Sequence, residues 1–302
     1  MKVALVGIGK IAVDQHVPSI VASNDWELAA TVSRAGTVDG VTAYSDLDQM
    51  LVENPDVEMV SLCLPPVPRF DYAAACLRAG RHVMLEKPPG ATLAEVHALK
   101  AMADDAGKVL FATWHSRMAK GVVAAKAALS GKVIQAAHID WKESVRQWHP
   151  NQDWVFEPGG MGVLDPGINA LSILTEVLPA PVHLKSGVMQ VPSNRQTPIT
   201  AELAFSGGVT ASFDWLKEGE QLWQMQFTAT DGTVVELYEG GNRCVVDGVE
   251  QSVSELGEYP ALYARMTNLV ELGQSDVDLA PMVHVSDIMT LCHRETVPAF
   301  DW

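Results

Sequence analysis

Short apolar runs alternate with amphipathic, helix-like segments through the first 115 residues. Each run carries few charges and stops at glycine, proline or a polar residue, as strands buried on both faces of a parallel sheet do. We expect strands at residues 3–6, 28–32, 59–64, 81–85 and 109–113, with helices ending near 22 and covering 69–79 and 93–106. Thr92 and Glu95 have capping-box spacing at the last of these helices. The repeated strand–helix units predict a doubly wound parallel sheet of the α/β class.

The pattern changes after residue 131, where apolar and polar positions alternate as in half-exposed strands. Glycine-containing turns separate several of these segments and predict hairpins. We expect strands at 133–141, 182–191, 200–205, 209–215, 224–229, 234–237 and 244–246, and closing helices at 259–272 and 283–293. The chain thus predicts two domains, 1–118 and 119–302, with a helix near 118–132 that fits either. The second is an α+β domain built on a large, mostly antiparallel open sheet.

Composition narrows the class of partner. The 302 residues carry a net charge of −16, which argues against nucleic acid and anionic membrane surfaces because both bind basic patches. No apolar run reaches the length of a membrane span, and the short N-terminal run indicates a strand rather than a targeting segment. The four cysteines lack the spacing of a zinc site and fit a reducing cytoplasm. We therefore expect a cytoplasmic protein whose partner is a small molecule.

The first predicted strand runs directly into Gly7-Ile8-Gly9-Lys10-Ile11-Ala12. This is a G-x-G-x-x-A motif with a strand before it and a helix after it, the context in which the motif binds a dinucleotide. Gly7 makes the tight turn, Gly9 lets the backbone approach a pyrophosphate, and Ala12 lets the helix pack on the strand. We expect a Rossmann domain with Gly7, Gly9, Lys10 and Ile11 at the cofactor; the alternative is an ordinary glycine turn.

The end of the second predicted strand indicates which dinucleotide binds. NAD sites usually carry an Asp or Glu about 20 residues after the glycines, for the ribose 2′-hydroxyl. Here the strand ends in Ser33-Arg34. An arginine pairs with a 2′-phosphate and a serine adds a hydrogen bond, so we expect NADP to be preferred and NAD to be tolerated. The alternative is that Arg34 only faces solvent.

Glu86-Lys87-Pro88-Pro89-Gly90 follows the fourth predicted strand and ends it at once. Lys87 is thereby placed at the carboxyl edge of the sheet, where open α/β sheets bind ligands. A partly desolvated lysine there can hydrogen-bond a reacting oxygen, although it can also simply extend into water. Neighbouring strands end at the same edge, and from this edge we add Cys63, Pro65 and Glu86 to the cofactor candidates. His115 ends the fifth strand and is either a ligand contact or a structural histidine.

Aromatic and acidic residues are frequent at the end of the predicted strand 133–141 and just after it. Trp141, Trp148 and Trp154 lie close in sequence, with Glu143, His149 and Asp153 among them. Tryptophan beside acids is typical of pockets for polyhydroxylated ligands, because the rings cover C–H faces while polar groups take the hydroxyls. Core packing is the alternative, and for Trp215 we expect core packing.

Asp165-Pro166-Gly167-Ile168-Asn169 opens the helix that follows this region. We expect Asp165 as the N-cap and Pro166 at the first helical position. Asp165 and Asn169 are four residues apart and so share a face if both are helical. A carboxylate and an amide held together in this way suit a buried polar site.

These features resemble the glucose-fructose oxidoreductase/inositol dehydrogenase (Gfo/Idh/MocA) family over the whole chain. The resemblance rests on the glycine motif, on Glu86-Lys87-Pro88 and on Asp165 four residues before position 169. Longer strings, such as Ala112-Thr113-Trp114-His115-Ser116 and Glu157-Pro158-Gly159-Gly160, are similar more narrowly to bacterial L-arabinose and D-galactose 1-dehydrogenases. That group oxidises an aldopyranose at C1 to a lactone with NAD(P)⁺. The resemblance also implies a cis Lys87–Pro88 bond and a homodimer formed through the open face of the second sheet.

The resemblance implies roles for individual residues. The reaction centre would be Lys87, Asp165 and Asn169. The residues that bind the sugar would be His115, Glu143, Trp148 and Trp223, and those that hold the 2′-phosphate would be Ser33 and Arg34.

One position departs from the wider family, which has a histidine where this chain has Asn169. Asparagine cannot take a proton, so the base is Asp165 or Lys87. We expect Asp165 to be the base and Lys87 to stabilise the developing oxyanion. No metal is expected, because the cofactor takes the hydride.

The sequence therefore predicts an NAD(P)-dependent oxidoreductase, an aldose 1-dehydrogenase acting on D-galactose and/or L-arabinose. One alternative is another sugar or inositol oxidoreductase of the same family. The other is a non-catalytic NAD(P)-binding sugar sensor, against which the presence of Lys87 and Asp165 argues.

Overall fold

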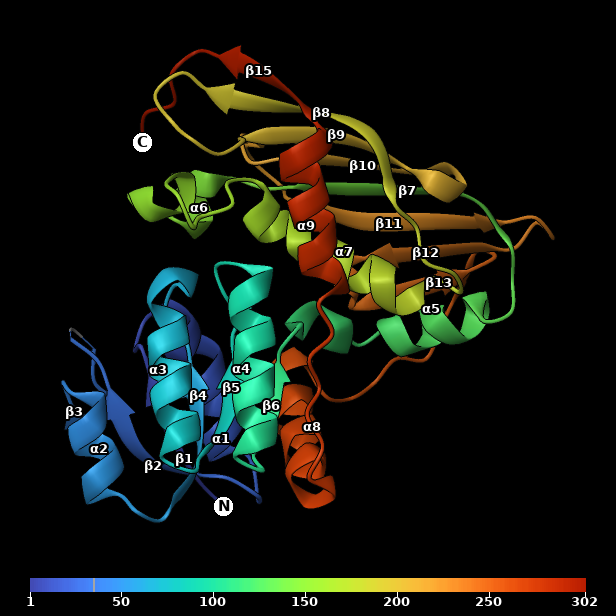
Figure 1. Ribbon diagram of the computed structural model, residues 1–302. Coiled ribbons are helices and arrows are strands. Elements are labelled where there is room, and N and C mark those ends of the chain that lie inside the picture. Colours follow the sequence, from blue (N-terminus) through green and yellow to red (C-terminus); the bar gives the residue numbers. More distant parts are fainter. Residues whose placement is uncertain (35) are drawn as a thin grey trace. The chain divides into compact units, whose positions relative to one another are not determined.

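The computed structural model describes residues 1–34 and 36–302, and it divides into two compact units (Figure 1). The first unit contains Met1–His115 and Glu258–Asp278, and the second contains Ser116–Gly257 and Leu279–Trp302. The sequence placed all of 119–302 in the second domain, whereas the structure groups 258–278 with the first. The reason is a long-range contact: Trp26 Nε1 donates to the carbonyl of Tyr263 at 3.2 Å, and both side chains are buried.

The first unit is built on a six-stranded sheet in which every pairing is parallel. Its strands are β1 (Lys2–Val6), β2 (Glu27–Val32), β3 (Thr42–Tyr44), β4 (Val57–Leu62), β5 (His82–Leu85) and β6 (Leu110–Ala112). Their order is β3-β2-β1-β4-β5-β6, which confirms the predicted doubly wound sheet. The order reverses between β1 and β4, and ligands of such sheets bind at the carboxyl ends of the strands around that point. The short strand β3 was not predicted.

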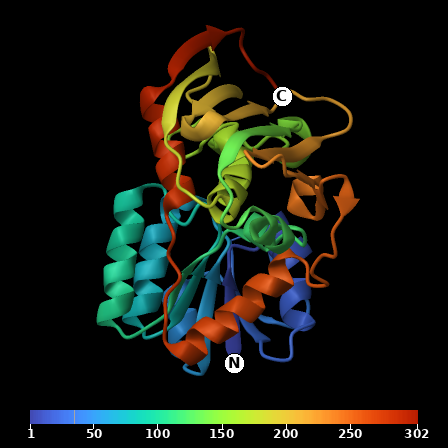
Figure 2. The ribbon, with the colours of Figure 1, turned by 90° about the vertical axis from the view of Figure 1, so that its right-hand side faces the viewer.

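Helices cover both faces of this sheet (Figure 2). Those of the first unit are η1 (Ala12–His16, a π-helical turn), α1 (Val17–Val21), α2 (Leu47–Glu53), α3 (Pro66–Arg78), α4 (Leu93–Asp105) and α8 (Glu258–Leu272). Helices α2, α3 and α4 share one apolar core with alternate strand residues such as Val6, Leu62 and Leu85. The predicted capping box of Thr92 and Glu95 is present at α4. Helices α1 and α8 contact each other.

The second unit is built on a nine-stranded sheet. Its strands are β7 (Ile134–Lys142), β8 (Leu184–Pro192), β9 (Thr200–Phe205), β10 (Val209–Asp214), β11 (Leu222–Ala229), β12 (Val234–Tyr238), β13 (Arg243–Val246), β14 (Val249–Glu250) and β15 (His293–Val297). They are ordered β14-β13-β12-β11-β7-β10-β9-β8-β15. Only the β7–β10 and β8–β15 pairings are parallel within the described ranges, so the predicted mostly antiparallel sheet is confirmed. The helix predicted for 283–293 ends earlier, and β15 follows it.

Helices pack on one face of this sheet (Figure 1). The helices and helical turns of the second unit are η2 (His115–Met118, which begins at the last residue of the first unit), α5 (Val122–Leu129), α6 (Val145–Trp148), η3 (Asp153–Phe156), α7 (Leu164–Val177), η4 (Ser206–Gly208), η5 (Glu239–Gly241) and α9 (Ala280–Leu291). Helices α5, α7 and α9 contact the sheet, where they cover alternate residues such as Ile139. The other face presents polar residues such as His138 and Thr210. None of the helices in the described part of the chain is long and apolar enough to cross a membrane.

A tight loop sets where α7 begins. Gly162 has a positive φ of 56°, and the next amide, that of Val163, donates to the carbonyl of Pro198 at 2.7 Å. The chain therefore enters the helix early: Val163 is the N-cap, and α7 starts at Leu164. The predictions that Asp165 is the N-cap and Pro166 the first helical residue were wrong, because Pro166 is the third residue of α7. Asp165 lies inside the first turn and is buried, with Asn169 one turn further along the same face.

We predict that Gly160→Ala, in the loop before α7, destabilises the protein. A Cβ at residue 160 would lie 2.3 Å from the carbonyl oxygen of Trp154 and 2.5 Å from that of Val155. These carbonyl oxygens belong to the backbone and cannot rotate away from the new Cβ as a side chain could. We therefore expect the free energy of unfolding to fall by about 1–3 kcal/mol in urea titrations. Gly9→Ala is the control, since a Cβ there meets no atom within 4 Å among the described residues. Equal losses in the two variants would contradict the prediction.

Candidate active site

The turn after β1 has the geometry that a dinucleotide requires. Gly7 has a φ of 89°, and a Cβ on it would lie 2.8 Å from the amide nitrogen of Leu64, so only glycine fits. A Cβ on Gly9 would point into space free of other described atoms within 4 Å, which leaves its backbone open to a phosphate. Ala12, the first residue of η1, is fully buried. The three small residues of the motif thus fit the roles expected of them.

Ser33 and Arg34 follow β2, the strand beside β1. Ser33 is held in place by its amide, which donates to the carbonyl of Tyr44, and by its Oγ, which accepts from the amide of Gly36 at 3.1 Å. The Arg34 side chain is exposed. Lys10 and Ile11 are also exposed, and Lys10 forms an ion pair with Asp14.

Arg69 of α3 forms hydrogen bonds to the ends of two neighbouring strands, β4 and β5. Its buried guanidinium donates to the carbonyl of Leu64, just after β4, and to the carbonyls of Glu86 and Pro88, just after β5. On the same β4 end, the Cys63 amide donates to the carbonyl of Val6 at 2.8 Å. Pro65 is exposed and forms the N-cap of α3. The Lys87–Pro88 bond is cis, as the family resemblance implied.

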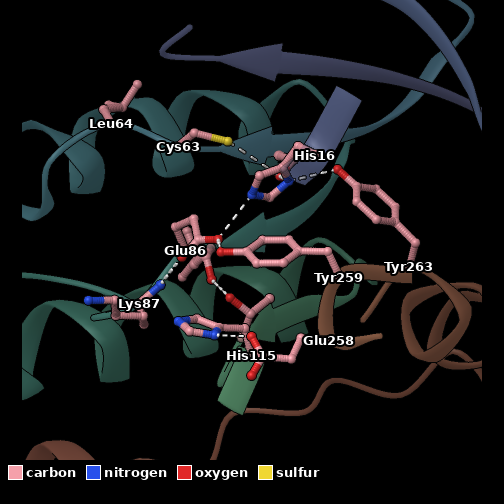
Figure 3. Close-up of polar contacts among 12 residues, drawn as sticks. His16, Cys63, Leu64, Glu86, Lys87, His115, Glu258, Tyr259 and Tyr263 are labelled. Atoms are coloured by element: carbon pink, nitrogen blue, oxygen red, sulfur yellow. Dashed lines mark hydrogen bonds and ion pairs between the residues drawn. The ribbon is translucent and has the colours of Figure 1, made fainter. Parts of the chain in front are cut away.

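The Glu86 carboxylate is the centre of a buried polar network (Figure 3). It accepts hydrogen bonds from His16 Nε2 at 2.9 Å, from Tyr259 Oη at 2.8 Å and from the backbone amide of Lys87 at 2.9 Å. His16 in turn meets Tyr263 Oη through Nδ1 at 2.8 Å. The network therefore joins the glycine-motif helix, the end of β5 and the start of α8.

Charge is balanced inside this network. Burial disfavours the ionised form of Glu86, but the hydrogen bond and charge of His16 outweigh burial and hold the pKa of the Glu86 carboxyl well below its ordinary value. Burial also opposes charge on His16, yet its interactions with Cys63, Tyr263 and Glu86 raise the pKa of His16 well above its ordinary value. Glu86 is therefore an ionised acceptor beside a protonated imidazole.

Lys87 and His115 lie beside this network. Figure 3 shows the Lys87 side chain extending away from the Glu86 carboxylate, while its backbone amide bonds to that carboxylate. His115 Nδ1 is 2.8 Å from Glu258 Oε2, and its ring stacks on Tyr259. Burial lowers the pKa of His115, but the charge and hydrogen bond of Glu258 prevail and raise the pKa, with Lys87 opposing them. Lys87 is thus close enough to His115 to act on its charge.

In the second unit, Glu143 is a buried carboxylate held by two indoles. Its Oε1 accepts from Trp215 Nε1 at 3.2 Å, and its Oε2 accepts from Trp223 Nε1 at 2.8 Å. Glu143 follows directly on β7, and its amide donates to the carbonyl of Asp214 at the end of β10. Trp215 is fully buried, as expected for a core residue, but it is also a hydrogen-bond donor to this site.

Three tryptophan rings continue the cluster. The Trp223 ring lies 5.9 Å from Trp141, nearly parallel, and 5.7 Å from Trp148, tilted by 40°. Trp148 Nε1 donates to Gln221 Oε1 at 3.1 Å. Trp141 is buried, whereas Trp148 and Trp223 are half-buried. Two aromatic faces thus lie beside a fixed carboxylate.

Asp165 connects to this cluster through a residue that was not among the predicted site residues. His149 Nε2 is 3.4 Å from Asp165 Oδ2, and the His149 ring lies 5.5 Å from that of Trp215. The contacts therefore run from Asp165 through His149 and Trp215 to Glu143. The sequence placed His149 near Glu143, but it carried no signal that the ring turns towards α7.

The structure thus gathers the predicted residues into two groups. In the first unit, Lys87 and His115 lie together. The carboxyl ends of β1, β2 and β4 carry, at or just beyond them, a further set of predicted residues: Gly7, Gly9, Ser33, Arg34, Cys63 and Pro65. In the second, Glu143, Trp148, Trp223 and Asp165 belong to one set of contacts. Sequence reasoning missed His16, Glu258, Tyr259 and Tyr263, because these residues meet their partners across long separations in the chain. It also missed His149, because the direction in which its ring points is not encoded by local sequence.

Comparison with known proteins shows the family of the chain. Residues 1–113 match the model of a family described as oxidoreductases with an NAD-binding Rossmann fold, GFO_IDH_MocA. The chain is 40% identical to galactose 1-dehydrogenase of Pseudomonas fluorescens, over 99% of this chain and 98% of that protein.

Solved structures include a similar galactose dehydrogenase. D-galactose-1-dehydrogenase from Rhizobium etli is 48% identical, with a TM-score of 0.93 over 99% of this chain and 97% of that chain. A 3-ketoreductase from Actinomadura kijaniata, solved with NADP and TDP-benzene, is 20% identical with a TM-score of 0.82 over 99% of both chains, and it supports the fold alone. Identity at the level of the two galactose dehydrogenases, over nearly the whole of each chain, shows that this chain belongs to the Gfo/Idh/MocA family of NAD(P)-dependent oxidoreductases.

Proposed function

We propose that the protein is an aldose 1-dehydrogenase that oxidises the C1 hydroxyl of D-galactose or L-arabinose, as the pyranose, to the lactone. The observation that carries the proposal is the full-length identity of 40% to one galactose 1-dehydrogenase and 48% to another. The two sugars share an axial C4 hydroxyl arrangement and differ at C5, so one pocket can accept both.

The tryptophan and glutamate cluster of the second unit supports a sugar as the substrate. The rings of Trp148 and Trp223 offer apolar faces to ring C–H groups, and the Glu143 carboxylate accepts hydrogen bonds from hydroxyls. Both Glu143 oxygens already accept an indole N–H, which fixes the carboxylate before a ligand arrives. An anion held in place by neutral donors suits a neutral polyol. We assign His115 to the sugar as well.

The residues at the carboxyl ends of β1, β2, β4 and β5 fit a dinucleotide, with NADP preferred and NAD tolerated. The open backbone of Gly9 suits the pyrophosphate, and Ser33 and Arg34 suit a 2′-phosphate. Lys10, Ile11, Cys63 and Pro65 complete the proposed contacts. When bound, the oxidised dinucleotide supplies the hydride acceptor. Glu86 supports this site through the Lys87 backbone, since its carboxylate is engaged in the buried network.

The proposed chemistry divides between two charged residues. Asp165 takes the proton of the C1 hydroxyl as general base. Lys87 stabilises the negative charge that develops on that oxygen. Asn169, one turn after Asp165 on α7, cannot take a proton and instead orients the sugar by hydrogen bonding.

We predict that the purified protein reduces NADP⁺ with D-galactose or L-arabinose, followed at 340 nm. D-glucose, D-xylose and myo-inositol, each with NADP⁺ and NAD⁺, provide the comparison. Lys87→Ala should lower kcat by about 10²–10³-fold, because one preorganised charge on the developing oxyanion is lost. Full activity in Lys87→Ala would remove the assigned role of Lys87. Cofactor binding without oxidation of any sugar would favour a sensor or another substrate class.

The cofactor preference gives a separate prediction. Arg34→Ala removes a charge-assisted hydrogen bond worth about 1.5–3 kcal/mol, so the KM for NADP⁺ should rise about 10–100-fold while that for NAD⁺ stays unchanged. Arg78→Ala, an exposed arginine at the end of α3, is the matched control. A parallel rise for NAD⁺ and NADP⁺ would contradict a role for Arg34 at the 2′-phosphate.

The proposed position of Lys87 depends on Glu86, and Glu86→Gln should destabilise the protein by about 3–5 kcal/mol near neutral pH, because it leaves protonated His16 buried without its counter-charge. The pKa of Glu86 is lower in the folded protein than in the unfolded chain. Its stabilising effect is therefore fully present above the ordinary glutamate value of 4.5 and is lost as the pH falls below it. His16 has the opposite sign: its contribution is complete below 6.5 and is lost only as the pH rises through its raised folded value.

Urea unfolding between about pH 3 and 7 checks this prediction. The wild type should lose free energy of unfolding below pH 4.5 more steeply than Glu86→Gln. Glu271→Gln, an exposed position of α8, should follow the wild type. Parallel pH curves for wild type and Glu86→Gln would show that the buried carboxylate carries no charge in the folded protein.

A further inference from the structure

His149 ends α6 and lies against the buried Asp165 of α7. Its Nε2 is 3.4 Å from Asp165 Oδ2. Its ring also meets the rings of Trp215 at 5.5 Å and Trp154 at 6.0 Å between centres, so two indoles fix its plane. Asn169, on the same helix face as Asp165, cannot exchange a proton with it. His149 is thus the imidazole that contacts the proposed base.

Hydrogen bonds on the far side of the ring determine where His149 carries its proton. Trp154 Nε1 donates to Gln152 Oε1 at 3.1 Å. An indole N–H is only a donor, so the atom that it meets is the amide oxygen of Gln152. The same oxygen lies 3.3 Å from His149 Nδ1. Because a carbonyl oxygen only accepts, Nδ1 must carry a hydrogen, and neutral His149 presents the lone pair of Nε2 to Asp165.

This tautomer changes what Asp165 can do. A lone pair facing an ionised carboxylate is repulsive, whereas one proton between the two atoms makes the contact favourable. A proton between His149 Nε2 and Asp165 Oδ2 therefore stabilises their contact. Asp165 can thus pass a proton on to His149.

We propose that His149 is a positioning residue for Asp165 and receives the substrate proton from it. This inference rests on the proposed function. As the hydroxyl O–H bond breaks, its proton goes to Asp165 and then to His149 Nε2, which becomes an imidazolium. The O–H electron pair forms the new C=O bond, and the C1–H pair leaves as the hydride that the oxidised dinucleotide accepts. One proton and one hydride leave the sugar, so the step balances.

The surroundings of His149 allow the proton to pass from the imidazole to solvent. The His149 side chain is 21% exposed, against 7% for Asp165, so the imidazole can return the proton to solvent. Asp165 is the ionisable group that faces it from α7. Glu143 lies beyond Trp215, to which it is bonded, and Asp153 of η3 is engaged by Arg195 and Trp302.

The tautomer is tested without substrate by NMR of ¹⁵N-histidine-labelled protein. We expect His149 to carry hydrogen on Nδ1 in its neutral form, with Nε2 facing Asp165. A neutral Nε2–H tautomer would overturn the proposal. This readout stands even if no sugar is oxidised, which separates its failure from that of the proposed function.

Kinetics test the role in the reaction. His149→Gln should lower kcat about 10²-fold, leave the KM for NADP⁺ unchanged and move the acidic limb of the kcat profile to lower pH. Imidazole added to His149→Ala should restore part of kcat. His293→Gln, on the exposed strand β15, is the matched control and should match the wild type.

An unshifted pH profile with only a higher sugar KM would make His149 a sugar contact and overturn the proposal. Should His149→Gln fail to fold, Gln152→Leu serves instead, because it removes the acceptor of Nδ1–H and leaves the imidazole in place. A kcat profile of Gln152→Leu identical to that of the wild type would then overturn the proposal.

Discussion

The charge on the buried Glu86 carboxylate is the constraint on which the first unit depends. An ion removed from water costs several kcal/mol unless donors and an opposite charge surround it. Here those donors come from three segments distant in sequence: His16 after the glycine motif, the Lys87 amide after β5, and Tyr259 in α8. None of these segments can shift without leaving the carboxylate unsatisfied. The glycine turn and the Lys87 backbone are therefore positioned by one common group.

The second unit also buries carboxylates, but their hydrogen-bond partners differ from those of Glu86. Glu143 is held by two neutral indole N–H groups, whereas Asp165 lies beside an imidazole. Indole N–H groups only donate, so they use Glu143 as a hydrogen-bond acceptor. A carboxylate beside an imidazole can exchange a proton. The neighbours of the two acids thereby support the separate roles that we propose for them, binding hydroxyls and moving a proton.

The same features support different proposed roles for the two units. In the first, small residues around β1 leave backbone open to a phosphate, and Arg69 fixes the strand ends that border it. In the second, aromatic faces surround a fixed carboxylate. The first unit therefore supports the proposed dinucleotide site, and the second supports the proposed polyol site.

The sequence by itself determined what depends on neighbours along the chain. Apolar runs and the G-x-G-x-x-A motif specified the parallel sheet, the glycine turn and the position of Lys87 at a strand end, because period and turn chemistry are local. Tertiary structure decided what depends on distant partners. In the structure α8 belongs to the first unit, and Asp165 lies in the first turn of α7 rather than at its cap. His149 lies against Asp165. Those outcomes follow from burial and from hydrogen bonds between segments far apart in sequence, which no local pattern encodes.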